Sequence, residues 1–92
     1  LGLCERGEAP DLLADGATAL DGDVAVNPSG GSLTANPLNA SGLYRAAQAS
    51  MALRGELSHP SLNNAKRAVV TDSDMMLGVR GSSDGALVLG KE

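Results

Sequence analysis

The residues best suited to chemistry lie in one loop, residues 27–42, which leads into a helix. Gly30 and Gly31 lack a Cβ atom, so the backbone can turn tightly there and approach a bound molecule. Asn36 and Pro37 stand just before the expected helix start, where free backbone N–H groups and the helix dipole favour negative charge. A side-chain amide at that place can donate a hydrogen bond to an oxyanion, which suits reactions through an enolate or a tetrahedral thioester intermediate. The alternative is that these residues only form turns, because Asn, Pro, Ser and Gly gather in loops anyway.

The other reactive side chains point to no second site. Cys4 is the single cysteine, which excludes an internal disulfide and a cysteine-cluster zinc site, and we expect it to be a small buried side chain. His59 is the single histidine and is expected in an exposed turn. Asp72 and Asp74 fit a solvated acidic turn better than a catalytic carboxylate pair. No metal site is predicted.

The loop resembles the C-terminal catalytic loop of the thiolase superfamily. That family has Asn-Pro-Ser-Gly-Gly, then Gly-His-Pro, then a Gly-Ala-Thr/Ser-Gly that starts a helix. The matching runs here are Asn27-Pro28-Ser29-Gly30-Gly31, Ala40-Ser41-Gly42 and, at the helix end, Leu53-Arg54-Gly55-Glu56. The chain departs from the family at Ala35-Asn36-Pro37, where the family has Gly-His-Pro.

The resemblance implies that Asn36 replaces the histidine that activates the nucleophilic cysteine and helps to bind the thioester oxygen. An amide donates hydrogen bonds but cannot take a proton at neutral pH, so we expect Asn36 to have an oxyanion role only. The other implied loop and backbone residues are Asn27, Ser29, Gly30, Gly31, Pro37 and Gly42. The family's nucleophile would lie in an N-terminal half that this chain lacks. The second family cysteine, in a Cys-x-Gly motif, has no counterpart between Thr71 and Gly85.

Three functions remain open. The first is a thiolase-like acyltransferase that makes or breaks a carbon–carbon bond in acyl-CoA thioesters; by analogy with the chalcone-synthase and hydroxymethylglutaryl-CoA-synthase groups, Asn36 could be the Asn of a Cys-His-Asn triad. The second is a catalytically reduced subunit that binds acyl-CoA or lipid-CoA, or supports a partner's active site. The third is a structural fragment without a role of its own. The coenzyme A thioester would be a substrate, and no cofactor is predicted.

The partners implied by the resemblance are an acyl-CoA substrate, an upstream thiolase half and further copies in a homodimer or tetramer. Some thiolase-like proteins pair with small OB-fold, zinc-ribbon proteins, so such a partner is also expected. The net charge of −4 disfavours nucleic acid, and no apolar run is long enough to span a membrane. The lone thiol fits a reducing cytoplasm.

The sequence divides into four segments. Residues 1–22 are a lead-in segment with a short helical turn from Pro10 to Ala14, and residues 23–37 hold a strand from Asp23 to Val26 followed by the catalytic-type loop. Residues 38–55 form a helix that begins at an Asn39 or Ser41 cap and ends at Arg54-Gly55. Residues 66–92 hold the last strands, around 68–70 and 86–89, separated by a glycine- and serine-rich turn.

The predicted fold class is α/β. The order strand-helix-strand-strand indicates the C-terminal part of a thiolase-like half-domain, with a mixed sheet and a helix packed on it. The chain has 92 residues, a single aromatic residue and no Phe or Trp, so the core it can bury alone is small. We therefore expect one domain at most, incomplete on its own, and poorly folded or oligomeric in isolation.

Overall fold

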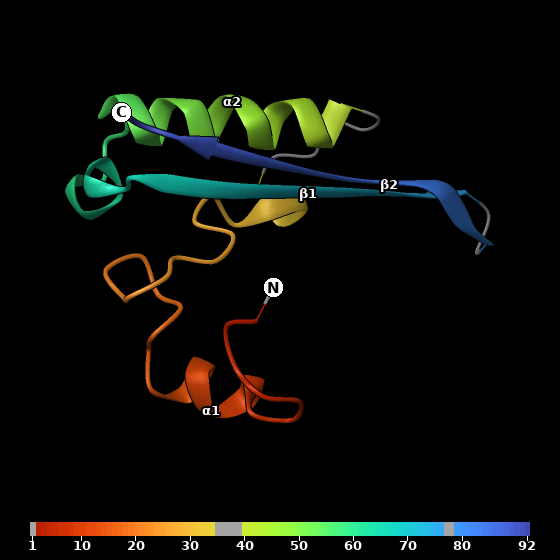
Figure 1. The fold of residues 1–92 in the computed structure, drawn as a ribbon, viewed down its shortest axis with the longest axis horizontal. Coiled ribbons are helices and arrows are strands. Elements are labelled where there is room, and N and C mark those ends of the chain that lie inside the picture. Colours follow the sequence, from red (N-terminus) through yellow and green to blue (C-terminus); the bar gives the residue numbers. More distant parts are fainter. Residues whose placement is uncertain (1, 35–39, 77–78) are drawn as a thin grey trace.

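The computed structural model describes residues 2–34, 40–76 and 79–92, in which one helix lies along a two-stranded hairpin (Figure 1). The elements in chain order are α1 (Ala9–Ala14), the 3₁₀ helix η1 (Gly31–Leu33), α2 (Ser41–Arg54), the 3₁₀ helix η3 (Pro60–Asn64), β1 (Arg67–Met76) and β2 (Val79–Gly90). In the view of Figure 1, α2 lies above the hairpin, and α1 and the N-terminus lie below it. The unit is therefore small and of mixed α/β content.

The helix α2 forms where the sequence predicts a helix. Ten of its 14 residues are Ala, Leu, Arg, Gln or Met, which favour helix formation. Its end is a Schellman motif: Gly55 adopts φ +75°, its N–H donates to the Ala52 carbonyl, and the Glu56 N–H donates to the Met51 carbonyl. The predicted stop at Arg54-Gly55 is confirmed. The start differs, because the N-cap residue is Ala40, without a side-chain cap, and Ser41 is already the first helical residue.

The two C-terminal strands are longer than the apolar runs that predict them. They pair antiparallel with Val69 opposite Val88 and Val70 opposite Leu87, with an irregularity between Ser73 and Met75. The glycine- and serine-rich stretch expected to be a turn is instead largely part of β2. In an antiparallel ladder every second residue pair exchanges backbone hydrogen bonds, and this tertiary pairing overrides a weak local strand preference.

The core lies between α2 and the hairpin. Leu53 of α2 and Val70 of β1 are the buried hydrophobic side chains among the described residues. Successive side chains of a strand point to opposite faces, so Val69 and its neighbour Val88 lie on the face away from α2. They are 50% and 69% exposed, so this face of the hairpin has little cover from the described residues.

The predicted strand from Asp23 to Val26 is wrong. Asp23 and Val24 form bends and the next two residues have no regular structure, and the Val24 and Val26 N–H groups donate to the carbonyls of Ala17 and Thr18 at 3.0 and 3.1 Å. A strand needs a neighbour to pair with, and both described strands are paired with each other. The prediction of a mixed sheet is therefore also wrong, because the described sheet is a purely antiparallel pair.

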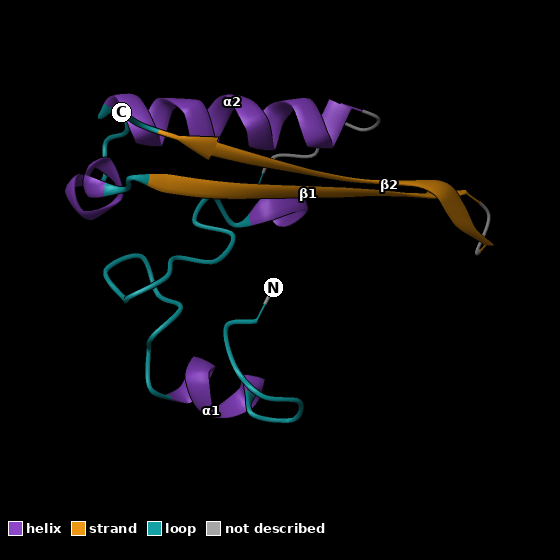
Figure 2. Ribbon diagram, in the orientation of Figure 1, coloured by secondary structure: helices purple, strands orange, loops and turns teal. Residues whose placement is uncertain are grey.

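The N-terminal region is mostly loop (Figure 2). The predicted helical turn is confirmed as α1, with Pro10 in its first turn. No residue of α1 is buried, so this short helix has no packed face. Cys4 is exposed rather than buried, because the segment around it does not pack into the core either.

Candidate functional site

The predicted site begins with a tight turn at Asn27. The Gly30 N–H donates to the Asn27 carbonyl at 2.9 Å, which places Pro28 and Ser29 at the centre of a β-turn. Proline suits the second position of such a turn because its φ is already fixed. Asn27 itself has φ +46°, a left-handed conformation that asparagine tolerates better than most residues. The tight turn that the Asn-Pro-Ser-Gly sequence predicts is therefore present in the structure.

Gly30 is constrained in two ways. Its φ is +83°, which favours glycine, and a Cβ atom there would lie only 2.9 Å from Thr34 Oγ1. Gly31 also has a positive φ, +62°, but no atom lies within 4 Å of the place of its Cβ. Gly30 is thus required by backbone conformation and by packing, whereas Gly31 is required by conformation alone.

Thr34 closes the turn, and the sequence analysis missed it. Its hydroxyl donates to the Ser29 carbonyl and lies 3.2 Å from the Gly31 carbonyl. The Ser29 hydroxyl oxygen in turn accepts from the Gly31 N–H at 3.3 Å. Threonine often bonds back to a carbonyl three to five residues earlier, so its place shortly after two glycines is the signal that could have identified it.

The residue on which the chemical hypothesis depends lies outside the described residues. Asn36 and Pro37 belong to the stretch 35–39, between Thr34 and Ala40. The oxyanion role of Asn36 therefore stays a prediction. The structure describes the two sides of that stretch: the turn that ends at Thr34 and the first turn of α2.

The first turn of α2 contacts β1 through Gly42. A Cβ atom on Gly42 would lie 2.9 Å from the carboxyl carbon of Asp72, so only glycine allows this approach without a shift. One turn later, Arg45 Nη1 lies 3.0 Å from Asp72 Oδ1 and donates to the Thr71 carbonyl at 2.9 Å. The structure thus joins a predicted site residue, Gly42, to a pair that sequence reasoning missed.

The acidic residues predicted in a solvated turn lie in a strand. Asp72 and Asp74 are both within β1, and Asp72 is paired with Arg45. The turn prediction failed because the strand extends well past its apolar start. Asp72 is half-exposed and has a cationic partner, which is the environment of an ion pair rather than of a catalytic carboxylate pair.

His59 has a structural role rather than the exposed position predicted for it. It is half-buried, and its Nδ1 lies 2.7 Å from the Ser61 hydroxyl. That hydroxyl donates to the Leu20 carbonyl at 2.8 Å, so its single proton is already used and Nδ1 is the donor to Ser61. The three residues link the N-terminal loop to η3.

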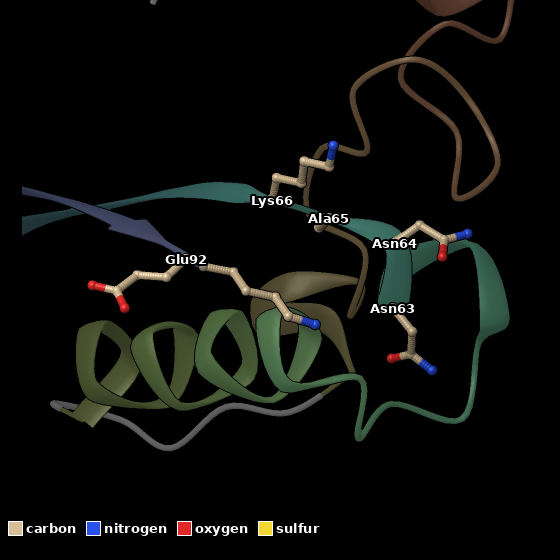
Figure 3. Close-up of a pocket in the computed structure, with 6 residues that line it drawn as sticks. Asn63, Asn64, Ala65, Lys66 and Glu92 are labelled. Carbon is tan, nitrogen blue, oxygen red and sulfur yellow. The ribbon is translucent and has the colours of Figure 1, made fainter.

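An open depression lies at the other end of α2 (Figure 3). Its lining residues are Asn63, Asn64, Ala65, Lys66, Lys91 and Glu92. The labelled Asn63, Asn64 and Lys66 side chains point in different directions, and the Asn63 amide is used by the Leu57 backbone at 3.0 and 2.8 Å. Since the 14-residue α2 is about 20 Å long, this depression is remote from the predicted site.

Among residues 2–34, 40–76 and 79–92, no three His, Cys, Asp or Glu side chains are grouped as metal ligands would be. No helix within the described ranges has the length and apolar character needed to cross a bilayer.

The chain matches known proteins over most of its length. Residues 1–91 match the family model described as "Thiolase C-terminal domain-like". The chain is 42% identical to an acetyl-CoA acetyltransferase of Methanothermobacter thermautotrophicus over 67 residues, 72% of this chain. It is 39% identical to sterol carrier protein 2 of Gallus gallus and 37% identical to that of Homo sapiens, each over 70 residues and 75% of this chain.

These matches cover only a small part of the relatives. The aligned region is 18% of the archaeal acetyltransferase and 13% of each sterol carrier protein 2. The search of solved structures gave no significant match. The family of the segment is therefore shown, and its relation to these two kinds of protein is limited to one region of each.

Proposed function

The chain belongs to the thiolase C-terminal domain-like family, and from this premise we propose that its protein is a thiolase-like acyltransferase. It acts on acyl-CoA thioesters and makes or breaks a carbon–carbon bond beside the thioester carbonyl. The identity with an acetyl-CoA acetyltransferase supports this substrate class. The coenzyme A thioester is the substrate, so the proposal needs no separate cofactor.

The observation that carries the proposal is the architecture on both sides of Asn36. Upstream, the Asn27–Gly30 turn is held by the Thr34 hydroxyl, which donates to the Ser29 carbonyl. Downstream, Gly42 lets the start of α2 pack closely against the Asp72 side chain. Glycines with positive φ, and a glycine in the first turn of a helix, let the backbone come close to another group. This combination fits a loop that brings hydrogen-bond donors to a thioester oxygen.

Asn36 supplies a hydrogen bond in the proposed reaction. Negative charge develops on the thioester oxygen as an enolate or tetrahedral intermediate forms, and a fixed amide N–H stabilises it. An amide cannot remove the proton or activate a thiol at neutral pH. The nucleophile and the base therefore come from residues outside this segment, in an upstream thiolase half.

A second candidate function is a catalytically reduced subunit. Two facts favour it: Asn36 stands where the family has a histidine, and there is no cysteine between Thr71 and Gly85. Such a subunit would hold an acyl-CoA or lipid-CoA molecule or support the active site of a partner, and sterol carrier protein 2 is among the relatives. Further copies of the chain in a homodimer or tetramer, and a small OB-fold zinc-ribbon protein, are the proposed partners.

The two functions are separated by assaying the protein as its gene encodes it. Acetoacetyl-CoA and longer 3-ketoacyl-CoA thioesters are offered with free coenzyme A, and thiolysis and CoA binding are measured. The variant Asn36→Ala is compared with Asn64→Ala, which changes the same residue type in the remote depression.

The acyltransferase proposal predicts turnover that Asn36→Ala lowers by about 10²-fold in kcat, the effect of losing one oxyanion donor, while Asn64→Ala leaves it unchanged. CoA binding without turnover in the unaltered protein would replace the first proposal by the second. Neither turnover nor binding would overturn both.

A further inference from the structure

We propose that Arg45 and Asp72 are positioning residues for the thioester site. Together with Gly42 they form what we call the α2 clamp, which fixes the first turn of α2 on β1. Asn36 lies a few residues before this turn in the sequence. The inference rests on the proposed function, because the thioester site is part of that proposal, but the clamp itself is built only from described residues.

The Arg45 guanidinium contacts two successive residues of β1, Thr71 and Asp72. Its Nη1 atom lies 3.0 Å from Asp72 Oδ1 and donates to the Thr71 carbonyl at 2.9 Å. One bond is to a side chain and the other to the backbone, so the contact resists sliding of the helix along the strand. The planar guanidinium is suited to such paired contacts, and a lysine ammonium cannot reproduce its geometry.

Gly42 makes the contact possible. The Asp72 carboxylate occupies the space that a Cβ atom on Gly42 would take. Glycine is a poor helix former, so its presence in the first turn of α2 is better explained by this close approach than by helix preference. The carboxylate therefore lies between the helix backbone and Arg45, and it touches both.

The clamp holds the end of α2 that the apolar core does not reach. Leu53 is the buried residue of α2, and it lies in the last turn. In Figure 1 the helix and β1 run in opposite directions, so the first turn of α2 lies over a later part of the strand than Leu53 does. The N-cap Ala40 provides no side-chain cap there. Polar contacts to Asp72 and Thr71 therefore determine where the helix begins on the sheet.

Position at this end matters more for rate than for binding. A displacement of about 1 Å in a reacting site can lower the rate by roughly 10²-fold. If the clamp opens, the first turn of α2 loses its contacts with Asp72 and Thr71. In the proposed function Asn36 acts on charge that develops in the transition state, so ground-state binding of the substrate should change little. The expected signature is a loss in kcat with little change in KM.

The test uses the protein as encoded by its gene and a matched control on the same helix. Arg45→Ala, Arg45→Lys and the near-isosteric Asp72→Asn are compared with Arg54→Ala. Arg54 pairs with Glu56 at 3.2 Å in the last turn of α2, so it is an ion pair of the same kind at the other end. kcat, KM, the melting temperature and amide hydrogen exchange of residues 40–46 are measured for each variant.

We expect Arg45→Ala and Asp72→Asn to lower kcat about tenfold with less than about a threefold change in KM. Amide exchange at residues 40–46 should become faster in both variants. The double variant Arg45→Ala with Asp72→Asn should lower kcat no more than either single change does. Arg54→Ala should change neither kcat nor this exchange. Asp72→Asn keeps the side-chain shape, so it remains informative if Arg45→Ala does not fold. A purely structural pair would lower the melting temperature and leave kcat per folded molecule intact, which would overturn the proposal.

Turnover and hydrogen exchange together separate this proposal from the proposed function. If the unaltered protein turns over no thioester, the acyltransferase proposal and the positioning role both fail, and faster exchange in Arg45→Ala but not in Arg54→Ala then shows only that the pair holds the start of α2 on β1. If turnover is present but Arg45→Ala leaves kcat and exchange unchanged, the clamp fails and the acyltransferase proposal stands.

Discussion

The Thr34 side chain occupies the space that a Cβ atom on Gly30 would need. The same side chain donates its hydroxyl proton to the Ser29 carbonyl, so packing and hydrogen bonding act on one turn. Gly30 has φ +83° as well, which makes the position doubly restrictive. The neighbouring Gly31 shares the left-handed conformation but faces open space, so the two glycines form a natural comparison.

Gly30→Ala should therefore destabilise the protein more than Gly31→Ala. A left-handed φ costs a residue with a Cβ atom about 1–2 kcal/mol, and the clash with Thr34 adds to this at Gly30 only. We expect losses in the free energy of unfolding of about 1 kcal/mol for Gly31→Ala and about 3 kcal/mol for Gly30→Ala. Guanidinium unfolding of the protein as encoded by its gene, followed by circular dichroism, measures both free energies.

Adding Thr34→Ala to Gly30→Ala provides the control. Removing the threonine methyl and hydroxyl relieves the clash but not the unfavourable φ, so part of the stability should return. Equal losses for the two single glycine variants would show that Thr34 does not hold the position described.

Local signals in the sequence predicted the elements that depend on few distant contacts. The Ala- and Leu-rich run and the Arg54-Gly55 stop define α2 because helix hydrogen bonds and the terminating glycine are all local. The strand from Asp23 to Val26 was wrong because a strand exists only where a neighbour pairs with it. For the same reason, the two C-terminal strands were located correctly but their lengths were not.

The candidate site also has a part that local sequence signals predict and a part that depends on distant contacts. The turn chemistry of Asn27, Gly30 and Gly31 follows from residue type, because positive φ values are a property of single positions. The pairing of Arg45 with Asp72 joins residues 27 positions apart, and no local pattern indicates it. Only the packing of α2 on β1 brings these two residues together.

The core position of Leu53 can be tested against an exposed leucine of the same helix. Leu53 is 7% exposed and Leu43 is 75% exposed, so the two differ in burial but not in residue type or helical setting. Leu53→Ala should lower the free energy of unfolding by about 2–4 kcal/mol, and Leu43→Ala should change it by less than about 0.5 kcal/mol. Thermal unfolding of the protein as encoded by its gene, followed by circular dichroism at 222 nm, gives both values, and similar losses would contradict the difference in burial between Leu53 and Leu43.

The isolated 92-residue chain should not melt sharply as a monomer. Its buried hydrophobic residues, over the parts that the structure describes, are Leu53 and Val70, and a core of this size offsets little of the conformational entropy lost on folding. Val69 and Val88 leave an apolar hairpin face exposed, which favours association as the concentration rises. We expect a broad thermal transition at low concentration and a larger sedimentation coefficient at high concentration, measured on the same preparation. A narrow, concentration-independent transition of a strictly monomeric chain would contradict this, because it would require more stabilisation than these two side chains and the hairpin ladder provide.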